Sequence, residues 1–272
     1  MLRSLYSGVS GMRGFQTKLD VIGNNIANVN TVGFKASTVT FKDMLSQTMQ
    51  GVTAPQDGRG GVNPMQIGLG VTIAAINTNH SSGSAMTTNN VLDLRIDGDG
   101  FFTVVDNEDQ ETPYLTRLGN FTLDAEGKLV TTDGLLVLSS EFEPIIMEDE
   151  WVSISISQTG EIIAKNEDGE TVNTDIFIGM INVMNPAGLS KIGNSLYEIT
   201  PNAVFEGEWE LTTPANAEMG TGKIISGQLE MSNVDLTTEF TELIIAQRGF
   251  QANSRIITTS DEVLQELVNL KR

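Results

Sequence analysis

The chain of 272 residues contains no cysteine and a single histidine, His80. The lack of cysteine excludes disulfides, thiolate nucleophiles and thiolate metal ligands. His80 lies in a stretch rich in serine and glycine, and no G-x-S-x-G motif accompanies it. We therefore expect an exposed loop histidine rather than a catalytic one. The sequence predicts no enzymatic activity, no cofactor and no metal.

Long apolar runs are also absent. No segment approaches the ~20 apolar residues that are needed to span a bilayer, so membrane insertion is not expected. The N-terminal segment lacks the apolar stretch and the small-residue cleavage site of a secretory signal. If the protein leaves the cell, we expect another route to carry it.

Positive charge is scarce, because 16 basic residues stand against 35 acidic ones and give a net charge of −19. Such a chain is repelled by phosphate backbones, so a nucleic-acid partner is not expected. The acidic excess lies in the middle of the chain. Residues 1–50 carry a net charge of +3, residues 231–272 carry −2, and residues 51–230 carry −20. This indicates either an ordinary acidic domain or a solvent-facing middle with protein-facing ends.

Apolar residues recur with heptad spacing at both ends of the chain. The N-terminal stripe contains Leu5, Met12, Leu19, Ile22 and Ile26, and the C-terminal stripe contains Leu236, Leu243, Phe250, Ile257 and Leu264. Four glycines interrupt the first stripe, each costing about 1 kcal/mol relative to alanine, so this helix should need a partner. Asp235 is the expected N-cap of a helix that reaches Lys271. A pair of core helices in a globular domain remains the alternative.

Between the two ends the apolar pattern changes to period two. Segments such as 101–105 and 151–156 alternate as strands do, and Asp-Gly turns separate such segments. We predict an α+β, mostly β fold, with a central antiparallel β-domain and terminal helices that pair as an α-helical coiled coil on assembly. The expected divisions are 1–30 and 232–272 as terminal helical regions, 31–70 as an extended linker, and 71–231 as a β-rich domain.

The segment 19–35, LDVIGNNIANVNTVGFK, resembles the N-terminal signature of the bacterial flagellar rod and hook protein family. Within it the signature residues are Asn24, Asn25, Asn28, Gly33 and Phe34. Segments 232–236 and 246–254 are similar to the family's C-terminal hallmark. The resemblance implies a structural axial subunit of the flagellar basal body and hook. It further implies type III export without a cleaved signal, so that the subunit becomes extracellular, and self-assembly into a helical tube.

Within this family, segments 2–12 and 267–272 resemble the short hook proteins of Gram-positive bacteria. The resemblance therefore favours the hook, the flexible joint that links rod to filament, with the distal rod protein as the alternative. The two heptad stripes would then form the polymerisation interface. Implied partners are further copies of the chain, the distal rod protein, the hook cap, the hook–filament junction protein and the flagellar type III export apparatus.

Overall fold

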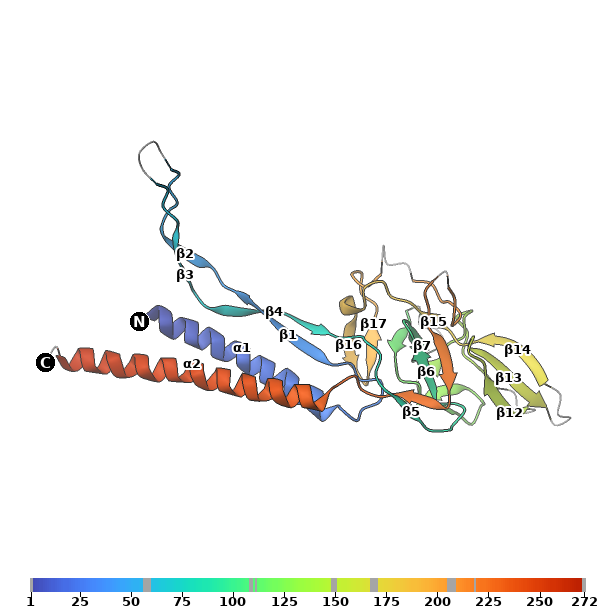
Figure 1. Ribbon diagram of the computed structural model, residues 1–272. Coiled ribbons are helices and arrows are strands. Elements are labelled where there is room, and N and C mark those ends of the chain that lie inside the picture. The colour runs from blue at the N-terminus through green and yellow to red at the C-terminus, as the bar shows by residue number, and fades with distance from the viewer. Residues whose placement is uncertain are drawn as a thin grey trace. The chain divides into compact units, whose positions relative to one another are not determined.

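The computed structural model describes residues 2–55, 60–107, 110, 112–147, 151–166, 171–204, 209–217 and 219–270. The chain divides into two compact units. Unit 1 comprises Met1–Ala27, Ser37–Thr78 and Asp235–Arg272, and unit 2 comprises Asn28–Ala36 and Asn79–Val234. The predicted α+β, mostly β fold is confirmed: the protein is mostly antiparallel β, with one helix near each end of the chain (Figure 1), whereas the coiled coil on assembly stays a prediction.

Unit 1 contains two long helices, α1 (Leu2–Ala27) and α2 (Leu236–Leu270), which lie side by side (Figure 1). Asp235 caps α2, because its carboxylate accepts hydrogen bonds from the Thr237 N–H (2.9 Å) and the Thr238 hydroxyl (2.8 Å). The hydrogen bonds from Thr238 and Thr237 hold the pKa of Asp235 below its usual value. Lys271, the predicted last residue of this helix, lies outside the described residues.

Unit 1 also contains a long antiparallel hairpin. Its base pairs β1 (Ser37–Asp43) with β4 (Val71–Thr78), and its outer part pairs β2 (Ser46–Gln50) with β3 (Met65–Gly68). The base packs along α1. The segment expected to be a 31–70 linker therefore contains three paired strands, β1, β2 and β3, and residues 71–78 lie in unit 1 rather than in a β-rich domain beginning at 71. Alternating apolar residues such as Val39, Val71 and Ile73 explain the pairing, because one face of the hairpin covers the helix.

Unit 2 is built around an eight-stranded antiparallel sheet of order β16-β17-β8-β7-β11-β10-β9, with β15 paired to β7. Its strands are β7 (Phe101–Val105), β8 (Tyr114–Thr116), β9 (Phe121–Leu123), β10 (Leu129–Thr131), β11 (Leu136–Val137), β15 (Met180–Ile181), β16 (Ser190–Gly193) and β17 (Leu196–Glu198). A short 3₁₀ helix, η1 (Pro186–Gly188), precedes β16.

Smaller antiparallel sheets complete unit 2. Three strands form one sheet: β12 (Trp151–Ile156), β13 (Glu161–Asn166) and β14 (Thr171–Phe177). Two further pairs join β5 (Ala85–Thr87) to β19 (Gln228–Glu230) and β6 (Leu94–Asp97) to β18 (Lys223–Ser226). The last strands of the unit thus return to pair with its first strands.

The core of unit 2 surrounds β7, all five residues of which are buried. Phe102 and Val104 belong to the larger apolar cluster, and Phe101 belongs to a second cluster with Leu115 and Tyr197. The period-two alternation expected for 101–105 is therefore not observed, because a strand that is buried on both faces carries a nearly continuous apolar run. The core therefore gives unit 2 its own source of stability.

Candidate assembly surface

Helices α1 and α2 pack antiparallel, and small residues of one helix lie against larger residues of the other. Gly8 faces Ile257, Gly11 faces Asn253, and Gly249 faces the ring of Phe15. A Cβ placed on Gly249 would lie 2.6 Å from that ring. Gly8 and Gly11, which the sequence marks only as weakening the N-terminal helix, are therefore also positions at which a second element approaches closely.

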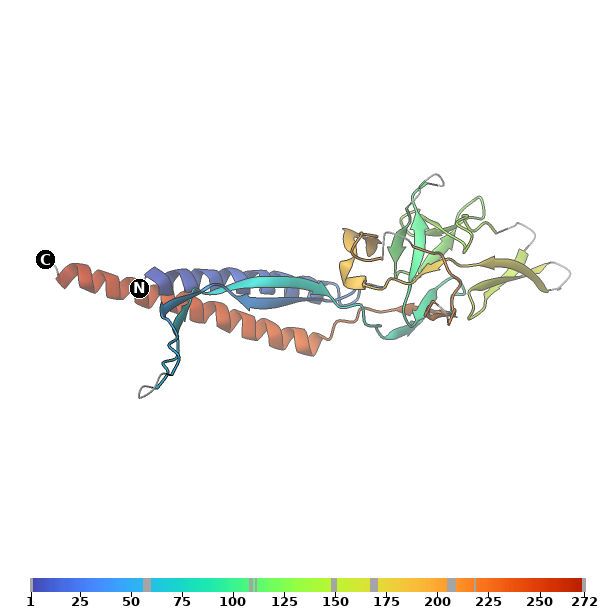
Figure 2. The ribbon, with the colours of Figure 1, turned by 90° about the horizontal axis from the view of Figure 1, so that it is seen from above.

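On another side of α1, the base of the hairpin makes similar close contacts. A Cβ on Gly14 would lie 2.8 Å from the ring of Phe41, which also packs on Phe15 with a centroid distance of 5.7 Å. The Ser10 hydroxyl donates to the Ser7 carbonyl (2.9 Å) and accepts from the Val71 N–H (3.4 Å). Helix α1 is thus covered by α2 and by the hairpin, which makes the three elements one packed assembly (Figure 2).

Asn25, a signature residue on α1, forms hydrogen bonds with the first residue of the hairpin. Its side chain accepts from the Ser37 N–H (3.0 Å), donates to the Ser37 carbonyl (2.8 Å) and donates to Glu239 on α2 (3.2 Å). Asn25 is 1% exposed, so these bonds replace water completely. Burial raises the pKa of Glu239, and the hydrogen bond from Asn25 opposes that rise. Lys18 pairs with Glu242 one turn further along α2.

The residues predicted to form the polymerisation interface fall into three groups. Ile22 is buried, and seven of the others are half-buried: Leu5, Met12, Leu19, Ile26, Leu243, Ile257 and Leu264. Leu236 and Phe250 are exposed. The structure holds one chain, so their role between chains stays a prediction.

Sequence reasoning missed a second apolar face of α2. Its members are exposed in the single chain: Ile245, Ile256, Val263, Leu267 and Leu270. Ile245, Ile256 and Val263 are 11 and 7 residues apart, and both spacings return to the same side of a helix. That spacing could have revealed the face. Large apolar surfaces of this kind mark interaction sites.

The outer hairpin presents further apolar side chains that the linker prediction did not anticipate. Those exposed in this region include Leu45, Met49, Val52, Val62, Met65 and Ile67. All residues of β2 and β3 are exposed, because the two strands pair only with each other. An isolated hairpin is marginally stable in water, so these strands gain from a covering partner.

In unit 2, a buried charge cluster contains Lys35, the last residue of the signature segment 19–35. Lys35 Nζ lies 2.7 Å from Glu230 Oε1, and Arg117 Nη1 lies 3.4 Å from Glu230 Oε2. Glu230 also accepts from the Gly83 N–H (2.8 Å). Burial lowers the pKa of Lys35, whereas the charge of Glu230 opposes that change. Sequence reasoning missed this cluster, because its members are far apart in the chain.

The signature residues Asn28, Gly33 and Phe34 shape the segment that leads to Lys35. Asn28 accepts the Thr31 N–H and hydroxyl in a turn, and Gly33 has a φ of 67°, which disfavours a side chain. The Gly33 N–H donates to the Glu230 carbonyl (2.8 Å), and Lys191 lies over the ring of Phe34. The remaining signature residue, Asn24, is exposed on α1.

His80 is not the exposed loop residue that the sequence predicted. It is half-buried and packs on Phe101 and Tyr197, with centroid distances of 5.7 and 5.4 Å. Burial, followed by the positive charges of Lys35 and Lys191, lowers the pKa of His80 to about 4. Its place within an aromatic cluster, which residue spacing did not show, explains the difference. His80 is therefore neutral at physiological pH.

Two further properties of the described residues bear on the class of protein. Among them, no group of three or more His, Asp or Glu side chains could hold a metal ion. None of the helices in the described part of the chain is long and apolar enough to cross a membrane. What the described chain does show is extensive exposed apolar surface on α2 and the hairpin, as expected of a structural subunit that associates with other chains.

Comparison with known proteins agrees with this class. Three family profiles match: "Flagella basal body rod protein" over residues 5–35, "Flagellar hook protein FlgE/F/G D1 domain" over 95–164, and "Flagellar basal body rod FlgEFG protein C-terminal" over 225–270. The chain is 54% identical over 274 positions to the flagellar basal-body rod protein FlgG of Bacillus subtilis, covering 100% of both chains. The chain belongs to the flagellar rod and hook protein family, whose members are structural proteins and not enzymes.

Two relatives from one organism represent the rod and the hook proteins of this family. The chain is 36% identical over 279 positions to the basal-body rod protein FlgG of Borreliella burgdorferi, and 28% identical over 451 positions to the hook protein FlgE of the same organism. Both alignments cover 100% of each chain. Because this chain has 272 residues, many positions of that hook protein have no counterpart in it. The family implies a polymer within the flagellar basal body and hook.

Proposed function

We propose that this protein is a subunit of the distal rod of the flagellum rather than of the hook. The observation that carries the proposal is the end-to-end match, 54% identical, to a basal-body rod protein. The hook relative is less similar and longer. The proposal reverses the sequence-based preference for the hook and adopts its alternative.

In this function, unit 1 supplies the contacts that build the polymer. The α1–α2 pair and the hairpin leave apolar side chains exposed that further copies would cover, which supports self-assembly through the two chain ends. The coiled-coil arrangement between copies and export by the type III apparatus belong to the same proposal. Neighbouring subunits would be further copies and other rod and hook proteins. The hook cap and the hook–filament junction protein would be neighbours only if the chain formed the hook.

Electron microscopy of basal bodies from a strain that lacks the gene tests this proposal. A distal rod subunit is needed before the hook can be added, so we expect truncated rods without hooks. Restoring the gene should restore full-length rods and hooks, which controls for effects on neighbouring genes. Complete rods without hooks would instead assign the chain to the hook.

A further inference from the structure

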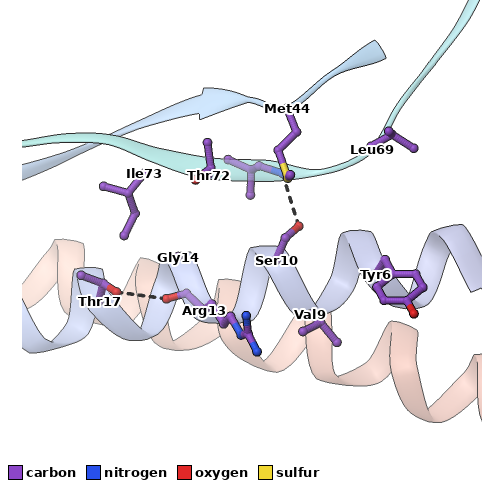
Figure 3. A pocket seen from close by; sticks show the side chains of 11 residues that line it. Tyr6, Val9, Ser10, Arg13, Gly14, Thr17, Met44, Leu69, Thr72 and Ile73 are labelled. Carbon is purple, nitrogen blue, oxygen red and sulfur yellow. Dashed lines mark hydrogen bonds between the residues drawn. The ribbon is translucent and has the colours of Figure 1, made fainter. Parts of the chain in front are cut away.

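A groove opens between α1 and the hairpin, with Tyr6, Val9 and Arg13 on the helix side and Met44 and Ile73 on the hairpin side (Figure 3). Its volume is about 390 Å³, which is enough for several side chains. Tyr6 is 73% exposed and Met44 is 43% exposed, so much of the apolar lining faces water. The groove therefore offers a binding surface for an apolar segment.

Arg13 gives this groove a preference for a partner that carries a negative charge. Within the part of the chain that the structure describes, it is the one charged residue of the lining, and it forms no ion pair there. An exposed cation beside apolar side chains favours a partner segment that carries an acidic residue among apolar ones.

The C-terminal end of α2 is such a segment, and it has no partner on α1. Gly8 lies beside Ile257, and Gly11 lies beside Asn253, so in an antiparallel pair Leu2 lies near residue 262. The residues of α2 beyond that point extend past the start of α1, as Figures 1 and 2 show. Leu267, Val268 and Leu270 are exposed there, the last of them at 81%.

One face of this overhang, residues 263–270, complements the groove. Val263, Glu266, Leu267 and Leu270 follow the spacing i, i+3, i+4 and i+7, which places them on one side of the helix. Glu266 is exposed, and among the described residues no cation pairs with it. Three apolar side chains and one carboxylate thus complement an apolar groove that contains one guanidinium group.

The overhang cannot reach the groove of its own chain. The sequence from Phe250 to Leu270 contains no glycine or proline, and it forms one uninterrupted helix. A turn back onto α1 would require this helix to break, which such a sequence does not favour. The occupant of the groove must therefore come from another molecule.

We propose that the overhang of one copy docks in the groove of a second copy, with Val263, Leu267 and Leu270 against the apolar lining and Glu266 beside Arg13. This inference rests on the proposed function in one respect, which is that the chain forms a polymer. The apolar contacts supply most of the affinity, and the ion pair selects the register and orientation.

Disulfide crosslinking tests the contact directly, because the full chain contains no cysteine. Cells would produce two single-cysteine variants together, Leu267→Cys and Met44→Cys, and oxidised basal bodies would be analysed on a gel. We expect a crosslinked dimer that neither variant gives alone. Leu267→Cys with Thr122→Cys, an exposed position of β9, is the control pair. The proposal is overturned if assembled basal bodies give no 267–44 dimer or if the control pair crosslinks equally well.

A charge exchange provides a second test. Arg13→Glu should reduce the yield of assembled rods by about tenfold, because two acids then meet in the contact. Adding Glu266→Lys in the same chain should restore the yield. Arg3→Glu, an exposed position of α1 outside the groove, is the matched control and should change the yield little.

The outcomes separate this inference from the proposed function. Normal assembly by Arg13→Glu, or a double variant that assembles no better than the single one, would overturn the docking contact. Neither result would affect the rod assignment, which is tested by the length of the rod in the deletion strain. Conversely, complete rods in that strain would overturn the rod assignment but not a 267–44 crosslink within a polymer.

Discussion

At the scale of single residues, glycine has opposite effects at two positions of the helix pair. Gly249 lies against the ring of Phe15, and a Cβ there would lie within 3 Å of three ring atoms. Gly23 has no atom within 4 Å of the position that a Cβ would occupy. The first glycine permits close helix packing, whereas the second only lowers helix propensity.

Alanine substitutions should therefore change stability in opposite directions. Gly249→Ala should destabilise the helix pair by about 1–2 kcal/mol, because overpacking outweighs the gain in helix propensity. Gly23→Ala should stabilise it by up to about 1 kcal/mol. Thermal unfolding followed by circular dichroism at 222 nm would measure both. Equal stabilisation by the two variants would show that α1 and α2 are not packed closely.

The buried charge cluster makes a second prediction at this scale. Glu230→Gln would leave Lys35 and Arg117 buried without an anion, which should destabilise unit 2 by about 3–5 kcal/mol. Glu198→Gln, an exposed acid of β17, is the control and should change stability by less than about 0.5 kcal/mol. Urea unfolding followed by the fluorescence of Trp151 and Trp209 reports on this unit. Similar midpoints for the two variants would contradict the account.

His80 should make the stability of unit 2 depend on pH. Burial lowers its pKa from 6.5 to about 4 in the folded chain. As the pH falls from about 6.5 to 4, the unfolded state binds a proton at His80 that the folded state does not, so stability decreases over that range. His80→Phe keeps an aromatic ring but cannot titrate, so stability should fall less steeply with acidification than in the parent. Parallel urea midpoints at pH 7.5, 5.5 and 4.5 for both proteins would refute this.

At the residue scale, local patterns could be predicted from the sequence, whereas contacts between distant segments could not. The heptad stripes could be predicted, because their spacing is local and periodic. The contacts of Lys35 with Glu230 and of His80 with Tyr197 could not, because they join segments more than 100 residues apart. The sequence marks Gly8, Gly11 and Gly14 as weak helix formers, but which element each one faces depends on tertiary packing.

At the scale of elements, the helices were easier to predict than the hairpin. The helix expected at 235–271 is observed as Leu236–Leu270, because a cap and a long stripe both mark it. The sequence of the hairpin indicates a linker instead, because its outer strands alternate weakly and its connecting segment is rich in glycine and proline. Pairing between β1 and β4 spans residues 37–78, a range over which local pattern carries little information.

The outer hairpin should contribute to assembly and not to the stability of the single chain. Met49→Ser, Val52→Ser and Met65→Ser together should leave thermal unfolding unchanged, because these side chains are exposed. Assembly should weaken, since each 100 Å² of apolar surface that a neighbour buries contributes about 2.5 kcal/mol. Sedimentation of polymers would measure the loss. Gln47→Ser with Gln50→Ser on the same hairpin is the control, and an equal loss of assembly by the control would argue against an apolar contact.

At the scale of the whole molecule, the acidic excess lies in unit 2, because residues 51–78 of unit 1 contain only Asp57 and Arg59 as charged residues and are neutral. Residues 51–230 carry the acidic excess, whereas the helical ends are nearly neutral and expose apolar faces. The fold class and the family could be predicted from sequence, because signature motifs mark both ends of the chain. The preference for the rod over the hook could not, since the motifs are shared by both branches and the proposal rests on similarity over the whole chain.

The position of the protein in isolated rod–hook structures tests the central claim most directly. A short epitope inserted between Ala125 and Glu126, in an exposed turn of unit 2, should be tolerated, and retained motility would confirm this. Gold-labelled antibody should then mark the rod next to the hook and leave the hook itself unlabelled. Gold distributed along the hook would contradict the account and assign the chain to the hook.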